Sequence, residues 1–385
     1  MKLQTLPPDS IPQLLDLSTL DLKALRELAD TLVTHNIASY RALQVSVDGH
    51  PDARQWKKLR QKDDIRVYKE RVVTSTSSKL CIPSLLLLGT VVGKLEDVMF
   101  VASVATDEQM KLTSKCMEDG VVDCKVLHSI VHPTNDAPFR HVGVKWRLHD
   151  GRDYVCLDAT GITTNSNGEQ FGFSISHSIA FAQVPTLDKF GIERANMSMC
   201  CLFRQKTDDT VECYARGFYD FGSDSSELLT NLSINAVATQ WLSFARFIDC
   251  AEMKKLVWRM RKNSGLPVNG PMTIEPLKEV TNLSASAKKS SHGCGICNRS
   301  YGFSLRRMCK NCQRCVCSNC SVKKLVCVLA PDRRTVLDKK RTFCTICTWE
   351  VIQSDALVIA RDQIHELQSQ RLKAQCQPHD DEYTD

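Results

Sequence analysis

The first periodic pattern along the chain is an apolar stripe at helical spacing near the N-terminus. Within residues 20–43 the stripe consists of Leu22, Leu25, Leu28, Ala29, Leu32 and Val33. Spacings of three and four residues place these side chains on one face of an amphipathic helix, and Asp21 is placed to cap its first turn. The pattern therefore predicts a helix within an N-terminal segment that covers residues 1–54.

Between residues 65 and 220, short alternating runs replace the helical pattern. In the clearest run, 171–181, bulky residues such as Phe171 and Phe173 alternate with small ones such as Gly172 and Ser174. A period of two is typical of a strand with one bulky and one small face. Further strands are predicted at 85–88, 139–148, 154–159, 197–204 and 211–219. We expect these strands to form a mostly antiparallel sheet.

Helical spacing returns after residue 224. Val237, Trp241, Phe244 and Ile248 predict one long amphipathic helix that ends near residue 260. Prolines and small polar residues within 263–291 predict a flexible linker. A further helix is expected at 350–375, and the acidic tail 376–385 is expected to be disordered.

Composition places the chain among ordinary soluble proteins. Its 385 residues are 43% hydrophobic and 24% charged, which suits two or three domains. No apolar run is long enough to span a bilayer, and the sequence opens without the apolar core of a signal peptide. We therefore expect a cytoplasmic protein.

Eight of the 19 cysteines form four C-x-x-C pairs near the C-terminus. The pairs are Cys294/Cys297, Cys309/Cys312, Cys317/Cys320 and Cys344/Cys347. Two such turns complete the four-thiolate shell that structural zinc prefers, so the spacing predicts two Zn²⁺ sites. The alternative, a disulfide framework, is typical of secreted proteins and is disfavoured here. Cys315 and Cys327 lie off this spacing. Either thiol could replace one of the eight ligands, but we expect neither to bind zinc.

Positive charge gathers around these cysteines. Between residues 292 and 349, twelve lysines and arginines accompany only Asp332 and Asp338. Eight thiolates on two Zn²⁺ ions reduce the excess to about +6, which still suits a phosphate-bearing surface. The alternative is a basic face that only keeps a small cysteine-rich module in solution.

Residues 55–262 resemble the START lipid-transfer domain. The resemblance rests on the order of the predicted elements, with a helix near 95–104 and a long helix at the end, and on the segments 139–146 and 152–155. In that helix-grip fold, a curved antiparallel sheet wraps the last helix around an apolar tunnel. The resemblance implies an α+β START-like domain that holds an apolar lipid.

Residues 292–349 resemble the FYVE zinc finger in their cysteine frame and in the basic segment before Cys309. The resemblance implies a cross-brace, in which the first and third pairs share one zinc ion and the second and fourth pairs share the other. It also implies docking on membrane phosphoinositides, such as phosphatidylinositol 3-phosphate, at endosomes. The implied phosphate-binding residues are Arg306, Arg307, Lys310 and Arg341. The implied membrane-inserting residues are Tyr301, Phe303 and Leu305; the alternative is that Phe303 and Leu305 pack inside the small domain.

The finger departs from the lipid-binding members of that family at three places. Ser291-His292-Gly293 stands where they have Trp-x-x-Asp, no double histidine precedes Cys309, and Arg341 precedes Cys344 by three residues instead of two. We therefore describe it as FYVE-related. The alternative function is a protein-interaction adaptor whose finger docks a small GTPase or another trafficking protein.

Signatures of other functional classes are missing from the sequence. It contains no Gly-x-Ser-x-Gly elbow, no Gly-x4-Gly-Lys-Ser/Thr loop and no His-Glu-x-x-His. The histidines that a C2H2 nucleic-acid-binding finger needs are absent. We expect no enzyme activity and no nucleic-acid partner. The prediction is a non-enzymatic lipid-binding protein that is peripheral on endosomal membranes.

Overall fold

The computed structural model describes residues 6–7, 10–71, 84–149, 151–221, 227–265, 293–300 and 307–375. The chain forms two compact units, the first made of Met1–Pro133 and Phe139–Ala251 and the second of Thr134–Pro138 and Glu252–Asp385. Residues 266–291 of the predicted linker and the acidic tail lie outside the described residues. Among the described residues, no helix combines the length and apolar character needed to cross a bilayer.

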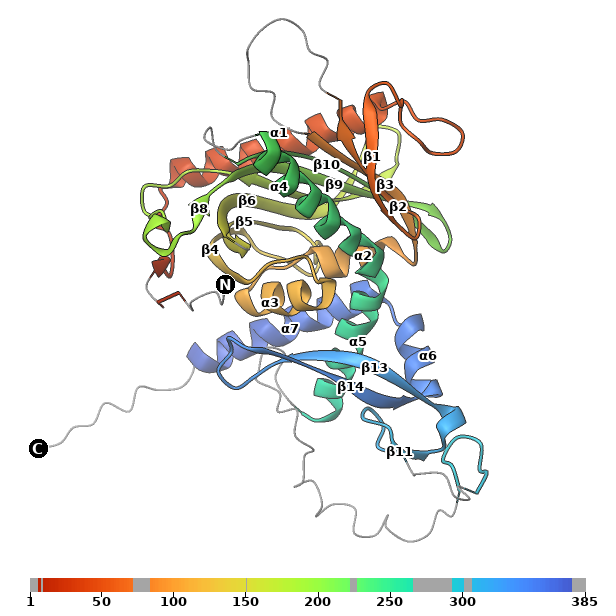
Figure 1. The fold of residues 1–385 in the computed structure, drawn as a ribbon. Helices are drawn as coiled ribbons and strands as arrows, with labels where there is room; N and C mark the ends of the chain where they lie inside the picture. The colour runs from red at the N-terminus through yellow and green to blue at the C-terminus, as the bar shows by residue number, and fades with distance from the viewer. Residues whose placement is uncertain are drawn as a thin grey trace, which may run out of the picture. The chain divides into compact units, whose positions relative to one another are not determined.

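A large antiparallel sheet forms the centre of the first unit (Figure 1). Its strands lie in the order β1-β2-β3-β10-β9-β7-β6-β5-β4, and β8 pairs with β6 in parallel. Their bounds are β1 Trp56–Lys62, β2 Ile65–Glu70, β3 Ser84–Val92, β4 Asp123–Val131, β5 His141–His149, β6 Arg152–Thr164, β7 Gln170–Ser178, β8 Glu193–Arg194, β9 Asn196–Thr207 and β10 Thr210–Asp220. The predicted α+β class with a mostly antiparallel sheet is confirmed.

One face of this sheet packs against α1, which spans Thr19–Ala42. Phe173 and Ile175 of β7 lie in this core together with Leu25 and Ala29 of α1. The bulky face predicted from the alternation in β7 is therefore the face that α1 covers. The helix begins one residue before the predicted range, because Ser18 accepts a hydrogen bond from the Asp21 N–H and Asp21 closes a capping box.

The opposite face carries the small residues of β7 and is covered by the remaining helices of the first unit. These are α2 Leu95–Ala102, α3 Asp107–Met117, α4 Glu227–Gln240, the 3₁₀ segment η3 Trp241–Arg246 and the beginning of α5 Phe247–Asn263. In Figure 1, α4 runs across this side of the sheet. At Gly172, an added Cβ would lie 2.5 Å from the Met99 sulfur. A small residue is thus required where α2 crosses β7.

The predicted single helix after residue 224 is wrong in one respect, because η3 interrupts it. In a 3₁₀ turn, side chains three residues apart point the same way. Trp241 and Phe244 have this spacing and both are buried. The Trp241 indole N–H also donates to the Tyr219 hydroxyl at 3.0 Å, so the 3₁₀ turn is hydrogen-bonded to β10 of the sheet.

The last twelve residues of α5 belong to the second unit, whereas the sequence suggested a domain limit at residue 262. Lys255, almost completely buried, donates to the Ser354 carbonyl at 2.7 Å. Arg259 pairs with Glu350 at 2.9 Å, and Lys324 pairs with Glu252 at 2.7 Å. These bonds attach the second half of α5 to the cysteine-rich region.

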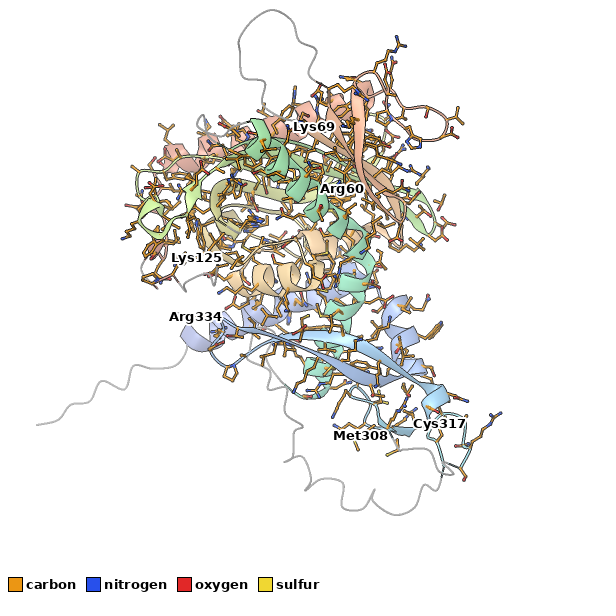
Figure 2. The ribbon with its side chains drawn as sticks, viewed as in Figure 1. Arg60, Lys69, Lys125, Met308, Cys317 and Arg334 are labelled. Carbon is orange, nitrogen blue, oxygen red and sulfur yellow. The ribbon has the colours of Figure 1, made fainter. Side chains whose placement is uncertain are left out.

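The cysteine-rich region is built on a long hairpin that the sequence did not predict. The hairpin consists of β13 Ser321–Leu329 and β14 Val336–Cys344, which pair in antiparallel register. A two-stranded sheet of β11 Arg307–Met308 and β12 Cys315–Val316, and the 3₁₀ segment η5 Ser318–Cys320, precede it. Figure 2 shows Arg334 at the end of the hairpin that is remote from Cys317.

Two helices follow the hairpin, where the sequence predicted one. They are α6 Thr345–Gln353 and α7 Ala356–Gln375. Ser354 leaves the helical conformation, and the Asp355 carboxylate accepts the Leu357 N–H at 2.7 Å. Serine and aspartate at these positions end one helix and begin the next, because their side chains bond the backbone locally.

Candidate functional sites: an internal cavity and two cysteine centres

A cavity of about 490 Å³ lies in the first unit between the small-residue face of the sheet and the covering helices. Side chains from β5, β6, β7, β9, β10, α2, α3, α4, η3 and α5 line it. Ser174 and Ser176 of β7 lie in its wall, so the small face predicted from the sequence provides its space. Leu232 of α4 lines the cavity and is itself 58% exposed, which places an edge of the cavity at the surface.

The charged side chains beside the cavity are paired with one another. Arg147 donates hydrogen bonds to both carboxylate oxygens of Asp158. Lys145, whose side chain is 1% exposed, lies 3.3 Å from the same carboxylate and donates to the Val104 carbonyl at 2.7 Å. Although burial opposes ionisation, the charges of Arg147 and Lys145 lower the pKa of Asp158 to about 2. Asp158 is therefore ionised at neutral pH and faces two basic groups, while burial lowers the pKa of Lys145.

Arg152 is also paired at the cavity wall. Its guanidinium lies 3.4 Å from the Glu193 carboxylate, donates to the Ser233 hydroxyl at 3.0 Å and lies over the Phe221 ring. Each arginine that lines the cavity thus has a carboxylate partner already. A ligand phosphate would have to compete with these carboxylates for the guanidinium groups.

Two neutral polar atoms in the cavity wall have no such partner. The Thr113 hydroxyl and the His149 Nδ1 are both buried, and neither has a hydrogen-bond partner among the described residues. Burial lowers the pKa of His149 to about 4 and outweighs the opposite effect of nearby Asp119, so the imidazole is neutral at pH 7. Buried polar groups normally find a hydrogen-bond partner, and these two atoms lack one within the described part of the chain.

The eight cysteines of the C-x-x-C pairs meet in two groups of four. One group contains Cys294, Cys297, Cys317 and Cys320, and the other contains Cys309, Cys312, Cys344 and Cys347. Within each group the sulfur atoms lie within 4.8 Å of one another. This is the pairing of first with third and second with fourth that the FYVE resemblance implied. Cys315 and Cys327 lie outside both groups.

The sulfur separations fit a shared metal ion. The Cys297 and Cys317 sulfurs lie 3.8 Å apart, and so do those of Cys312 and Cys344. A tetrahedral ion with metal–sulfur bonds of about 2.3 Å requires sulfur separations of about 3.8 Å. A disulfide would bring two sulfurs to about 2.05 Å. Each group therefore has the donor set and spacing for one tetrahedral metal ion.

Backbone and side-chain donors orient the thiolates. The Cys317 N–H donates to the Cys294 sulfur and the Cys347 N–H donates to the Cys344 sulfur, both at 3.3 Å. Asn311 is buried and donates to the Cys347 sulfur at 3.2 Å. Asn263 of α5 donates in turn to the Asn311 side-chain oxygen at 2.8 Å. The second centre is thus connected to α5 through two asparagines, a link that the sequence did not reveal.

These donors also affect the acidity of the thiols. Although burial opposes ionisation, backbone N–H groups lower the pKa of Cys294 to about 6. The pKa of Cys309 is lowered for the same reason. Burial and the neighbouring thiols raise the pKa of Cys320 to about 12. One thiol in each group ionises readily, whereas neighbouring thiols resist ionisation unless a cation compensates them.

Only part of the predicted phosphate site lies within the described residues. Arg306, Tyr301, Phe303 and Leu305 lie outside them. Arg307 of β11 donates to the Ser321 hydroxyl at 3.2 Å, and the Lys310 backbone N–H donates to the Thr342 carbonyl at 2.9 Å. The second bond places exposed Lys310 beside the part of β14 that carries Arg341. The chain fold thus brings Arg307, Lys310 and Arg341 to one end of the hairpin.

No family model and no curated protein matches this chain. Solved structures to which it is similar include human StAR-related lipid transfer protein 5, at 14% identity and a TM-score of 0.41 over 60% of this chain and 97% of that one. Human STARD10 is 11% identical with a TM-score of 0.39, and the match covers 66% of this chain and 86% of the STARD10 chain. A STAR-related lipid transfer protein fragment from Xanthomonas axonopodis is 14% identical, with a TM-score of 0.35. The match covers 51% of this chain and 98% of that fragment. At TM-scores this low, the fold assignment rests on the strand order and helices described above.

Proposed function

We propose that this chain is a non-enzymatic lipid-binding protein whose sheet cavity holds one lipid molecule. We further propose that its cysteine-rich unit, loaded with two Zn²⁺ ions, docks the protein on phosphoinositide-bearing endosomal membranes. The observation that carries the first part is the 490 Å³ cavity, which lies between the sheet and its covering helices. Its volume falls in the range of about 300–1,000 Å³ that is usual for small-molecule sites.

The walls of the cavity support an apolar ligand body. Met197, Met199, Phe203 and Val237 line it, together with Trp241. Apolar surface gains roughly 25 cal/mol per Å² when it leaves water. A lipid chain or ring system would therefore bind mainly through burial. Methionine side chains adapt well to such shapes, and aromatic side chains contribute a large apolar area.

The polar atoms of the cavity favour a lipid with a neutral hydroxyl group. A hydroxyl both donates and accepts hydrogen bonds, so it suits the Thr113 hydroxyl and the neutral His149 imidazole. A phosphate would bring negative charge near Asp119 while the cavity arginines are bound to Asp158 and Glu193. We propose that an alcohol group of the ligand lies against Thr113 and His149.

The two cysteine groups support structural zinc. Four thiolates occupy all four positions of a tetrahedral ion and leave none for water or substrate. Cys294, Cys297, Cys317 and Cys320 would hold one ion, and Cys309, Cys312, Cys344 and Cys347 the other. Zinc there would supply folding free energy to a small unit, with the N–H donors to sulfur fixing the ligand orientation.

Membrane docking of this unit is supported by its cations. Arg307, Lys310 and Arg341 lie at one end of the hairpin, and guanidinium and ammonium groups there can form charge-assisted hydrogen bonds to phosphate. Each cation near an anionic surface adds about 1 kcal/mol of attraction.

The cavity proposal is tested by incubating the full chain with vesicles of mixed lipid composition, re-isolating it and identifying bound lipid by native mass spectrometry. We expect one hydroxyl-bearing neutral lipid per chain. Thr113→Val keeps the side-chain shape but removes the hydroxyl, so we expect weaker retention of that lipid and unchanged or higher stability without it. Thr160→Val is the matched control, because the Thr160 hydroxyl donates to the Phe139 carbonyl at 3.0 Å outside the cavity. Retention of phospholipids alone would contradict the hydroxyl assignment.

A further inference from the structure

Helix α6 of the second unit carries an apolar face that stays partly exposed within the described part of the chain. Ile346, Trp349 and Ile352 follow one another at intervals of three residues and are 41%, 63% and 46% exposed. At this spacing the three side chains lie along one side of the helix. Large apolar side chains are normally buried, and an exposed tryptophan flanked by two isoleucines points to a contact surface.

The rest of the unit fixes the orientation of this face. Cys347, Thr348 and Val351 lie on the other side of α6 and are buried. Cys347 belongs to the second cysteine group, and Glu350 pairs with Arg259 of α5. Because its buried side is held at these points, α6 cannot rotate to hide the apolar side within its own unit.

Positive charge lies next to the first turn of this helix. Asn311 donates to the Cys347 sulfur, so the turn that carries exposed Lys310 contacts the first turn of α6. Residues 292–349, the segment that contains this turn, carry twelve lysines and arginines against two aspartates. An apolar face beside cations is complementary to a bilayer surface with anionic headgroups.

The size of the face distinguishes a membrane from a second protein copy. Three side chains at these exposures present on the order of 300 Å². A stable protein interface buries about 800 Å² on each partner. Interfacial anchoring has no such requirement, since a tryptophan and a few aliphatic side chains can enter the headgroup region on their own.

We propose that Ile346, Trp349 and Ile352 form a membrane anchor that enters the headgroup layer of anionic bilayers, with Lys310 at its edge. This inference rests on the proposed membrane association of the second unit and assigns it a contact surface on α6. These three residues are not the membrane-inserting residues that the sequence suggested, which are Tyr301, Phe303 and Leu305. The anchor would orient the second unit with the side of α6 opposite Val351 toward the lipid.

The test uses full-length zinc-loaded protein and vesicles of phosphatidylcholine and phosphatidylserine, with part of the phosphatidylcholine brominated in its acyl chains. Bromine quenches tryptophan fluorescence at short range, so we expect quenching on binding. Trp349→Phe should retain most binding and lose the quenching. The combined variant Ile346→Ser, Trp349→Ser and Ile352→Ser should weaken vesicle partitioning by more than about tenfold.

Leu20→Ser is the control, because Leu20 is an apolar residue that is 74% exposed on α1 of the first unit. Two zinc ions per chain must be retained in every variant, which separates loss of the anchor from unfolding. Unchanged partitioning of the triple variant, or quenching that persists in Trp349→Phe, would overturn the proposal. So would failure of the wild-type chain to bind these vesicles, or a wild-type dimer that the triple variant converts to a monomer. Lipid retention in the cavity, measured on the same samples, reports separately on the proposed cavity function.

Discussion

The two units of this protein obtain their order from different sources. The first unit has an apolar core between α1 and one face of a large sheet, and a cavity on the other face. The second has a hairpin and short helices around two groups of four cysteines. A large sheet can bury enough apolar surface to be stable while leaving a cavity, whereas a small unit needs cross-links or metal. The comparison predicts that the units respond differently to the same treatment.

The largest expected effect is loss of the second unit when its metal ligands are removed. Cys344→Ser opens one four-thiolate shell, and structural zinc contributes about 10–16 kcal/mol of apparent folding free energy. We expect one zinc ion fewer per chain and loss of amide protection in β13 and β14, with β5 to β7 unchanged. Metal analysis and hydrogen exchange measure this. Cys315→Ser is the control, because Cys315 lies outside both groups. A second unit that keeps its protection in Cys344→Ser would contradict the dependence on metal.

The next largest effect concerns the buried charges of the first unit. Asp158→Asn leaves Lys145 and Arg147 close together without their carboxylate partner. Removing one partner of a buried ion pair costs about 3–5 kcal/mol. Denaturant unfolding of the full chain should show this loss in the transition of the first unit only. Glu27→Gln, which removes an exposed pair with Lys23, should cost less than about 0.5 kcal/mol.

A smaller, pH-dependent effect should also be confined to the first unit. Burial, helped by the charge of Lys145, lowers the pKa of His141 to about 2, and burial lowers that of His149 to about 4. Below pH 6.5 both histidines are protonated in the unfolded chain but stay neutral in the folded chain. The free energy of unfolding must therefore fall as the pH falls. The slope is up to about 1.4 kcal/mol per pH unit for each histidine. Replacing His141 by Gln should reduce the slope between about pH 6.5 and pH 5, measured by hydrogen exchange of β5 and β6. An unchanged slope would show that His141 takes up its proton in the folded state.

The smallest expected effect tests the link between α5 and the second cysteine group. Asn311→Ala removes the hydrogen bond to the Cys347 sulfur and leaves all eight cysteines in place. Loss of such an outer partner typically lowers metal affinity by about 10–100-fold. Competition with a chromophoric chelator should show weakened retention of one of two zinc ions. Asn319→Ala is the control, since Asn319 lies in η5 and is exposed. Equal zinc retention in both variants would show that Asn311 does not stabilise the bound metal.

The sequence predicted the cysteine centres more fully than the cavity, for a physical reason. A C-x-x-C turn brings two thiolates together through local backbone geometry, so the spacing alone identifies Cys309 and Cys312 as partners. The alternation in 171–181 likewise identified the small face of β7. The unpartnered Thr113 hydroxyl and His149 Nδ1 come from α3 and β5, and the position of these residues at one cavity follows only from the complete fold.

Other features escaped the sequence because the signals are weak or shared between classes. The strands of the hairpin carry four lysines and Arg341, whose side chains hide the period of two that marks a half-buried strand. Ser354 and Asp355 separate α6 from α7 in a segment that otherwise continues with helix-forming residues. The sequence also did not reveal the exposed face of α6, because isoleucine and tryptophan are normally buried. Only the structure shows that Cys347 and Val351 occupy the buried side of the helix while Ile346 and Trp349 are exposed.

The central claim is that the small-residue face of the sheet forms a lipid-binding cavity, and native mass spectrometry of the full chain with Ser174→Phe tests it most directly. The phenylalanine would project from β7 into the cavity, whereas Ser166→Phe places the same side chain in the exposed turn before β7. We predict one lipid and two zinc ions per chain for the wild type and for Ser166→Phe, and two zinc ions without lipid for Ser174→Phe. A wild-type chain that never carries lipid, or a Ser174→Phe chain that keeps it, would contradict the account.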